Sequence, residues 1–178
     1  MKKETVLLVV VCLVVGVLSG IIFTNAKKDK AGSEEFSAVA SSIENQQQIA
    51  TLVKFVKKDP NNRNAWVQLG NNYFDTNQPM KAIEAYSKAL ELNGNDANVL
   101  TDLGVMYRRV GWYEKAVNSF AKANQIDPQH ATSLFNLGIV YLNDLNNKAK
   151  AKEAWEKYLV ISPVGKGADS VRTMLSEL

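Results

Sequence analysis

The chain has 178 residues, of which 46% are hydrophobic and 22% charged, and these are the values of a folded globular protein. Its formal net charge is only +3, and no basic block alternates with aromatic residues, so nucleic acid is not expected as a partner. One cysteine, Cys12, and one histidine, His130, exclude an intramolecular disulfide and a zinc site built from Cys and His ligands.

An uncharged run, TVLLVVVCLVVGVLSGIIF, occupies residues 5–23 near the start of the chain. As an α-helix it would span about 28 Å, close to the hydrocarbon core of a bilayer at roughly 30 Å. We therefore expect residues 1–25 to form a membrane anchor of the signal-anchor type. A cleaved signal peptide is the alternative, but the run is longer than a typical signal core and Thr24-Asn25-Ala26 is a poor cleavage site.

The charges that flank this run are nearly balanced, with two lysines before it and three shortly after it. A short tail before a first apolar segment usually stays in the cytoplasm. The sequence thus favours a single-pass protein of the bacterial inner membrane whose remaining chain lies in the periplasm. Cys12, Gly16 and Gly20 would line one face of the helix, and a homodimer through this small-residue face is one further alternative.

Residues 26–43 are mostly small, polar or charged, and this composition predicts a polar tether. The next stretch, ENQQQIATLVKFVKKDP, consists of helix-forming residues and ends in a turn signal. We interpret residues 44–62 as the second half of a repeat unit whose first helix is missing or degraded.

The frame Leu-Gly-x-x-Tyr then occurs three times at intervals of 34 residues, at 69–73, 103–107 and 137–141. Each frame belongs to a stripe of residues at i, i+3, i+4 and i+7, which is one face of an α-helix. A second stripe of small and aromatic residues follows after a turn, with the same helical spacing. The pattern predicts helix hairpins at 63–96, 97–130 and 131–165, the last with one additional residue in its middle turn.

Each predicted first helix contains a glycine, although glycine inside a helix costs about 1 kcal/mol relative to alanine. We infer that Gly70, Gly104 and Gly138 carry no side chain because a neighbouring helix comes close. The opposing surface would be formed by small residues of the second helices, namely Ala82, Ala116 and Ala151. Helix pairs of this kind bury their apolar faces only when they stack in series.

This pattern resembles the tetratricopeptide repeat (TPR), with its motif W-x2-L-G-x2-Y…A-x3-F…P. The second unit, LTDLGVMYRRVGWYEKAVNSFAKANQIDP, is a close match. The first unit departs at Gly94, where proline is usual, and the third departs at Tyr158, where a small residue is usual. The resemblance implies an all-α fold, a right-handed α-solenoid of three helix hairpins. The uncharged run at 5–23 predicts one transmembrane helix before it.

Incomplete units would close the TPR domain, which we place at residues 44–178. The partial repeat 44–62 would form its beginning, and residues 167–178 would form a capping helix at its end. In that helix, Val171, Met174 and Leu175 would cover the last repeat.

In this family, the first helices line a concave groove that holds extended peptides or partner helices. The resemblance implies that positions two, five, nine and twelve of each unit face this groove. The implied peptide-binding residues are Asn64, Val67, Asn71, Phe74, Asn98, Thr101, Val105, Arg108, Thr132, Phe135, Ile139 and Leu142, with the neighbouring Asn136. Their amides suit an extended backbone, and their apolar row suits a partner unless another element or a second copy covers it.

Some members of the family hold a carboxy-terminal carboxylate with a clamp of basic and amide residues. The corresponding positions here are Val67, Asn71, Asp102, Thr132 and Asn136. Only the amide of Asn71 fits, and the basic residues are absent, so we expect no such clamp.

We find no nucleophile–base pair, no phosphate-binding glycine loop and no pair of carboxylates in an apolar setting. We therefore expect no enzyme and no catalytic, cofactor or metal site. His130 follows Asp127-Pro128 and is expected to be an exposed turn residue.

The resulting hypothesis is a membrane-tethered protein–protein interaction module that binds a peptide or partner segment in its groove, in an adaptor or assembly role. A self-assembling structural scaffold is one alternative, because an incomplete repeat exposes apolar surface. Another follows from architecture and from the ending AKEAWEKYLVISP, which are similar to the TPR subunits that handle apocytochromes in bacterial cytochrome c maturation.

Overall fold

The computed structural model describes residues 30–178, with side chains from residue 43 onward. The predicted membrane anchor at 1–25 lies outside the described residues. The chain divides at Ser41/Ser42, and the repeats belong to the second unit, Ser42–Leu178. Within residues 30–178 every regular element is helical, and none of these helices combines the length and hydrophobicity needed to cross a bilayer.

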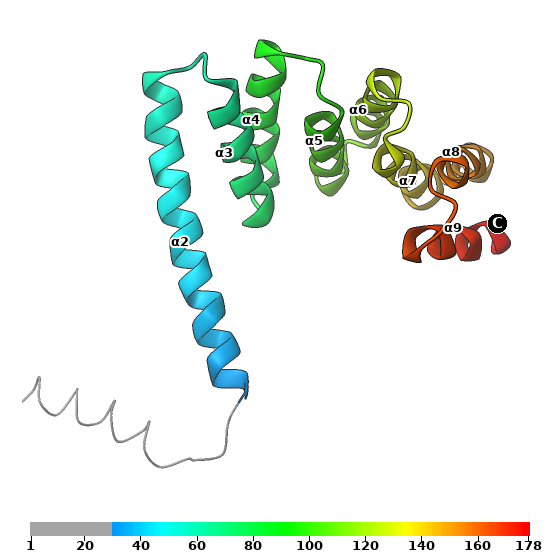
Figure 1. Cartoon of the computed structure of the whole chain (residues 1–178), viewed down its shortest axis with the longest axis horizontal. Coiled ribbons are helices and arrows are strands. Elements are labelled where there is room, and N and C mark those ends of the chain that lie inside the picture. The colour runs from blue at the N-terminus through cyan, green and yellow to red at the C-terminus, as the bar shows by residue number, and fades with distance from the viewer. Residues whose placement is uncertain (1–29) are drawn as a thin grey trace, which may run out of the picture. The chain divides into compact units, whose positions relative to one another are not determined.

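The helices follow one another as hairpins (Figure 1). After α2 (Lys30–Lys58) come α3 (Arg63–Asp75) with α4 (Pro79–Leu92), and α5 (Ala97–Arg109) with α6 (Tyr113–Ile126). The third hairpin consists of α7 (Ala131–Ile139), its π-helical continuation η1 (Val140–Asp144), and α8 (Lys148–Ile161), and α9 (Lys166–Ser176) closes the chain.

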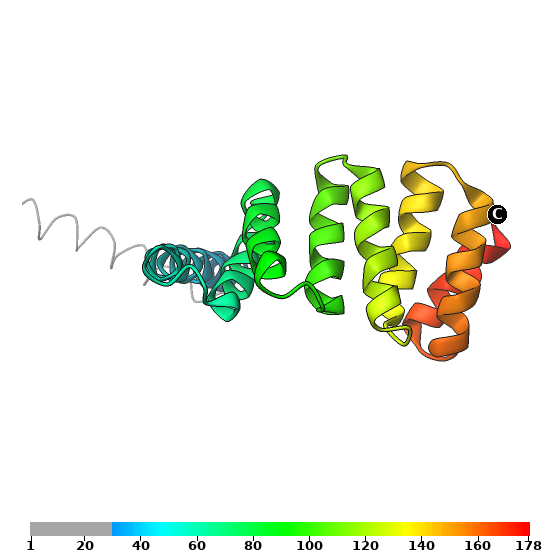
Figure 2. The same ribbon diagram turned by 90° about the horizontal axis from the view of Figure 1, so that it is seen from above.

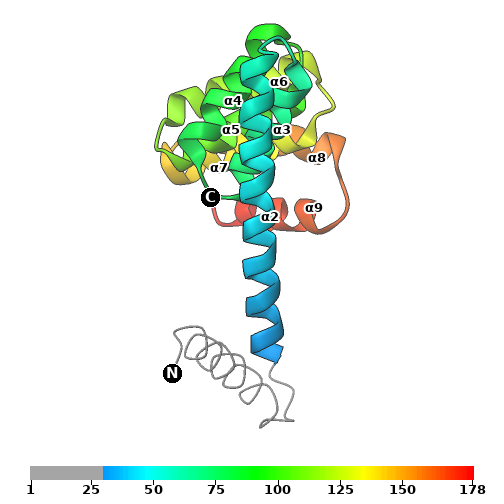
Figure 3. The ribbon, with the colours of Figure 1, turned by 90° about the vertical axis from the view of Figure 1, so that its left-hand side faces the viewer.

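The hairpins stack in chain order. Each first helix packs against the second helix of its own hairpin, and each second helix packs against the first helix of the next hairpin. The helices from α3 to α8 accordingly lie side by side in Figure 2, and one behind another in Figure 3, which views the stack from the α2 end. The C-terminal part of α2 joins this stack, because Val56 is buried in one cluster with Leu69 and Tyr73.

Helix α2 begins at Lys30, inside the range 26–43 for which the composition predicts a polar tether. Residues 30–43 are therefore helical and continuous with the partial repeat. No proline follows Gly32 before Pro60, so nothing in the sequence interrupts the helix once it has formed.

A residue in the left-handed conformation ends the first helix of every hairpin. Asn77, Gly111 and Asn146 have φ angles of 52°, 78° and 47°, and asparagine and glycine adopt such angles at the lowest cost. In the first hairpin the next N–H, that of Gln78, turns back to the carbonyl of Tyr73 over 2.8 Å. In the third hairpin the additional residue is absorbed by the π-helical turn η1.

The helical glycines lie against aromatic rings, which corrects the sequence prediction. A Cβ atom on Gly70 would lie 2.5 Å from the ring of Tyr86, and one on Gly104 would lie 2.6 Å from the ring of Phe120. Gly138 has the same relationship to Trp155. The prediction that alanines oppose these glycines was wrong, because the aromatic residue one turn further along the second helix fills the space.

Helix α9 covers the last hairpin. Ala168 and Val171 are fully buried, and Met174 and Leu175 pack against the same cluster. Gly167 leaves room for the hydroxyl of Tyr158, which a side chain at that position would meet. The bulky Tyr158 is thus accommodated by a glycine in the capping helix.

Candidate functional site

The predicted groove residues lie on α3, α5, α7 and η1, the first helices of the three hairpins. In the first hairpin, Asn64 and Asn71 are exposed, while Val67 and Phe74 are half-buried and pack on the core. Asn98, on α5, is also exposed. This part of the surface therefore offers amides to a ligand.

Other groove residues of α5 are already engaged. Thr101 is buried and donates its hydroxyl to the carbonyl of Ala97 over 2.7 Å. Val105 is half-buried between two core clusters. Arg108 forms an ion pair with Asp144 of the third hairpin, so its charge is neutralised within the protein.

The apolar residues of the third hairpin are partly covered. Phe135, Ile139 and Leu142 are half-buried and belong to the cluster that α9 closes. The ring of Phe135 lies with its centre 5.7 Å from that of Tyr158. Asn136 is half-buried and donates its amide to the carbonyl of Thr132, which is itself exposed. Val171, Met174 and Leu175 of α9 belong to the same apolar cluster.

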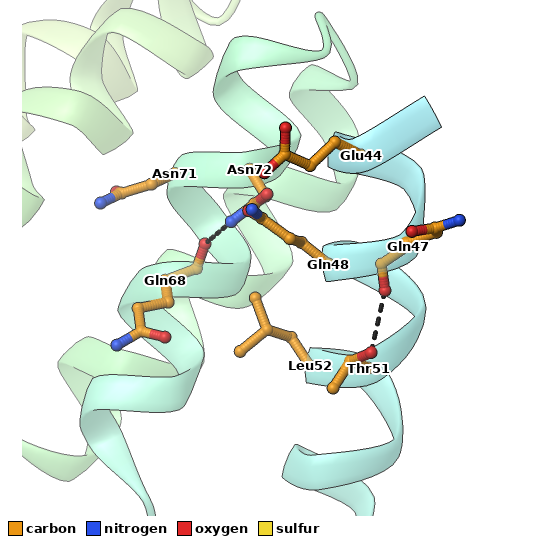
Figure 4. Close-up of a pocket in the computed structure, with 8 residues that line it drawn as sticks. All are labelled: Glu44, Gln47, Gln48, Thr51, Leu52, Gln68, Asn71 and Asn72. Carbon is orange, nitrogen blue, oxygen red and sulfur yellow. Dashed lines mark hydrogen bonds between the residues drawn. The ribbon is translucent and has the colours of Figure 1, made fainter. Parts of the chain in front are cut away.

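A hollow of about 550 Å³ lies between α2 and α3 (Figure 4). We call it the amide hollow, and its lining residues are Glu44, Gln47, Gln48, Thr51, Leu52, Gln68, Asn71 and Asn72. Gln48 and Leu52 point from α2 toward α3 in Figure 4. Asn72 donates to the carbonyl of Gln68 over 2.9 Å, and the remaining amides of the hollow can bind a ligand.

The amide hollow occupies the place that the first helix of the partial repeat would fill. Gln48 and Leu52 stand 34 residues before Ala82 and Tyr86, which are buried under α3 in the complete hairpin. Gln48 is exposed because no such helix covers it among the described residues. Sequence reasoning missed this hollow, although the amide-rich segment ENQQQ at 44–48 was a signal for it.

A second hollow, of about 250 Å³, lies on the other side of Asn71, between α3 and α5. We call it the Asp102 hollow, and it is lined by Asn71, Phe74, Asp75, Tyr86 and Asp102. The hydroxyl of Tyr86 donates to Asn71 Oδ1 over 2.8 Å. Burial, and then the charges of Asp96 and Asp75, raise the pKa of Asp102 to about 6 from 3.8.

The same surroundings act on Tyr86. Burial raises the pKa of its phenol above the ordinary value of 10.0, and the carboxylates of Asp102 and Asp75 raise it further. The hydroxyl therefore keeps its proton and remains a donor to Asn71. Two carboxylates and one neutral phenol thus share this hollow.

His130 is the N-cap of α7 rather than an exposed turn residue. Its Nδ1 accepts the N–H of Ser133 over 3.3 Å, and its Nε2 lies 3.0 Å from Asn98 Oδ1. Because the backbone N–H can only donate, Nδ1 is the acceptor and Nε2 carries the proton. The prediction of an exposed residue was wrong, because the ring packs over the junction between the second and third hairpins.

Three family models, each described as tetratricopeptide repeat, match residues 64–96, 85–118 and 132–163. The first and third coincide with hairpins, whereas the second begins in α4 and ends in α6. No catalytic family is among these matches. No curated protein matches the chain at a significant level.

Solved structures show the same fold. A crystal structure of MamA is 26% identical with a TM-score of 0.63, over 79% of this chain and 77% of that one. The Arabidopsis OM64 TPR domain is 22% identical with a TM-score of 0.61, over 65% and 94%. The first TPR of Spaghetti (RPAP3), bound to the HSP90 peptide SRMEEVD, is 19% identical with a TM-score of 0.60, over 65% and 90%.

The prediction of tetratricopeptide repeats is therefore confirmed by the family models and by the similar solved structures. Residues 64–118 and 132–163 of this chain match tetratricopeptide repeats, and they lie in an all-helical solenoid.

Proposed function

We propose that this chain is a membrane-tethered protein-interaction module that holds an extended segment of a partner protein, in an adaptor or assembly role. The observation that carries the proposal is the pair of hollows that meet at Asn71. The related fold of the Spaghetti (RPAP3) TPR, whose structure contains a bound peptide, supports this use of the surface.

The lining chemistry favours an extended segment. Gln48, Gln68 and Asn71 present side-chain amides, which both donate and accept hydrogen bonds and can pair with a peptide backbone. A wholly apolar helix would bury these amides without partners, at a cost of about 1–3 kcal/mol for each unsatisfied group. We therefore place the binding site on α2, α3 and α5, which contribute to the lining of the two hollows, rather than on the third hairpin.

The membrane anchor of the proposed module is the uncharged run at residues 5–23. Its length and composition suit a single-pass anchor in a bacterial inner membrane, with the repeats in the periplasm. A periplasmic reporter enzyme fused after Leu178 tests this topology in bacterial cells. Activity of the fusion is the expected result, and activity only of a cytoplasmic reporter would contradict it.

The binding proposal is tested by selecting random 12-residue peptides displayed on phage against the full chain solubilised in detergent. An enriched peptide, labelled with fluorescein, should lose about tenfold in affinity when Asn64→Ala and Asn71→Ala are combined. The matched control is Asn118→Ala with Gln125→Ala, which removes two exposed amides from α6. Equal affinity of both double variants, or no enriched peptide at all, would contradict the proposal.

A second candidate function is self-assembly into a structural scaffold. Phe55 stands 34 residues before Ala89, which is fully buried, yet Phe55 is 46% exposed. A second copy could cover this apolar position of α2. Sedimentation equilibrium of the full chain in density-matched detergent checks this candidate. A mass that rises with concentration and falls with Phe55→Lys would support it, whereas a concentration-independent monomer would exclude it.

A further inference from the structure

Asp102 presents a carboxylate for which the described residues provide no partner. It lies on α5 and is half-buried at the wall of the Asp102 hollow. Among residues 43–178 no ion pair or hydrogen bond involves its carboxylate. A carboxylate that loses water without gaining a donor is destabilised, so this group gains from any cation that enters the hollow.

Two arginines of α3 and α5 are paired with other carboxylates. Arg63 forms its ion pair with Asp96, whose charge raises the pKa of Asp102. Arg108 forms its ion pair with Asp144. Neither arginine is therefore available to neutralise Asp102.

A third arginine, Arg109, packs on Phe74, and its positive charge partly offsets the rise in the pKa of Tyr86. The guanidinium of Arg109 is 4.6 Å from the centre of the Phe74 ring, and it donates to the carbonyl of Phe74 and to Asn77 Oδ1. The carboxylates of Asp75 and Asp102 thus share one hollow without a matching cation among the described residues.

The other walls suit a long cationic side chain. The rings of Phe74 and Tyr86 provide an apolar surface for methylene groups, as lysine and arginine stems prefer. The Tyr86 hydroxyl gives its hydrogen to Asn71, so its oxygen is left as an acceptor. The amide nitrogen of Asn71 remains free of hydrogen bonds to residues 43–178 and can bind a peptide carbonyl.

We propose that the Asp102 hollow receives a lysine or arginine side chain of the segment bound across α2, α3 and α5, with Asp102 as its main ionic partner and Asp75 as the second. The inference rests on the proposed function, because it assigns the chemistry of the bound segment. That segment is an extended peptide with at least one basic residue, flanked by backbone that pairs with the amide hollow.

Charge decides the selectivity of such a hollow. An acidic side chain would meet two carboxylates and be repelled, and a neutral side chain would leave Asp102 buried and unpaired. Acidic carboxy-terminal segments, such as the HSP90 peptide in the Spaghetti (RPAP3) structure, are therefore excluded as ligands at this position. The hollow instead favours a positively charged side chain.

Proton binding gives the site a second signature. Because the pKa of Asp102 is raised to about 6, this carboxyl group is protonated in most molecules of the free protein at pH 5. In those molecules it carries no charge that could attract a cation. The groups that face it are Asp75, Asp96 and Tyr86, and the charge of Arg109 acts on Tyr86. The affinity for a basic peptide should therefore rise between pH 5 and pH 7. This rise should be larger than the change in affinity for a neutral analogue of the same peptide.

The test uses the peptides enriched by display on the full chain in detergent. Each lysine of the tightest peptide is replaced in turn by norleucine, which keeps the stem and removes the charge, and each arginine by citrulline. Fluorescence anisotropy gives the Kd for the wild type, for Asp102→Asn and for the control Glu84→Gln. Glu84 is exposed on α4, and its replacement changes the net charge equally.

One replacement should weaken binding to the wild type and to Glu84→Gln about tenfold, and should weaken binding to Asp102→Asn by less than about threefold. Circular dichroism verifies that Asp102→Asn is folded. Equal losses in all three proteins would overturn the inference while leaving peptide binding intact. Failure of every peptide to bind the wild type would instead overturn the proposed function, and the inference with it.

Discussion

The hydroxyl of Tyr86 donates a 2.8 Å hydrogen bond to Asn71, and this bond joins the core of the first hairpin to its exposed face. The same ring fills the space beside Gly70, so one side chain both packs the helices and orients a groove amide. Stability and binding are therefore coupled at this residue, and the coupling can be separated by mutation.

Tyr86→Phe removes the hydroxyl and keeps the ring. We expect the free energy of unfolding to fall by about 1 kcal/mol, the typical net contribution of one hydrogen bond. Peptide affinity should fall by about threefold, because Asn71 loses its orientation. Urea unfolding followed by circular dichroism, with anisotropy for binding, measures both. Tyr113→Phe, on α6, is the control, and an identical loss of affinity in that variant would refute the coupling.

Gly104→Ala places a Cβ atom 2.6 Å from a ring carbon of Phe120. We expect a net loss of about 1–3 kcal/mol in the free energy of unfolding, because overpacking outweighs the better helix propensity of alanine. Gly94→Ala is the matched control, since its Cβ would meet only ordinary contacts at 3.5 Å or more. Urea unfolding of the two variants measures the loss. The double variant Gly104→Ala/Phe120→Leu, measured in the same way, should recover part of it. Equal stability of the two single variants would disprove the close approach.

Asp102→Asn should stabilise the protein at pH 7. The folded-state pKa of about 6 lies above the ordinary value of 3.8, so the folded state binds the proton more tightly than the unfolded state does. The destabilising effect of this carboxylate is absent below pH 4, grows as the pH rises toward 6, and is complete above it. The gain from Asp102→Asn should be near zero at pH 4 and about 1 kcal/mol at pH 7, after allowance for its remaining contact with water. Urea unfolding at both pH values measures the difference, and a variant less stable than the wild type at pH 7 would show the sign to be wrong.

His130→Ala removes the N-cap of α7 and the contact with Asn98. We expect a loss of about 1 kcal/mol in the free energy of unfolding, as for other N-cap residues. His130→Asn, whose side-chain oxygen can accept from Ser133, should recover most of it. Urea unfolding of both variants decides whether the cap matters, since equal losses would assign the effect to something other than capping.

The hairpins were predictable because the buried residues of a helix recur at helical spacing in the sequence. Glycine, leucine and tyrosine at helical spacing located the first helices, and the left-handed residues Asn77 and Gly111 lie in the turns that follow two of these helices. Spacing along one helix does not fix how a second helix is rotated against it. The ring of Phe120, rather than Ala116, therefore proved to be the partner of Gly104.

The candidate site was less predictable for a related reason. Among residues 30–178 no further helix packs beside α2 to fill the amide hollow. Its lining is recognised only when Gln48 is compared with the buried Ala82 one repeat later. Asp102 was considered only as a missing basic residue of a carboxylate clamp. Its own role depends on burial and on arginines paired elsewhere, which are properties of the three-dimensional arrangement.

Photo-crosslinking of an enriched peptide to the full chain tests the central claim most directly. The photoreactive residue p-benzoylphenylalanine is placed at position 51, which lines the amide hollow, or at the control position 118 on α6. Efficient crosslinking from position 51, competed by unlabelled peptide and absent from position 118, is the expected result. Crosslinking from position 118 and not from position 51 would show that partners bind elsewhere on the solenoid.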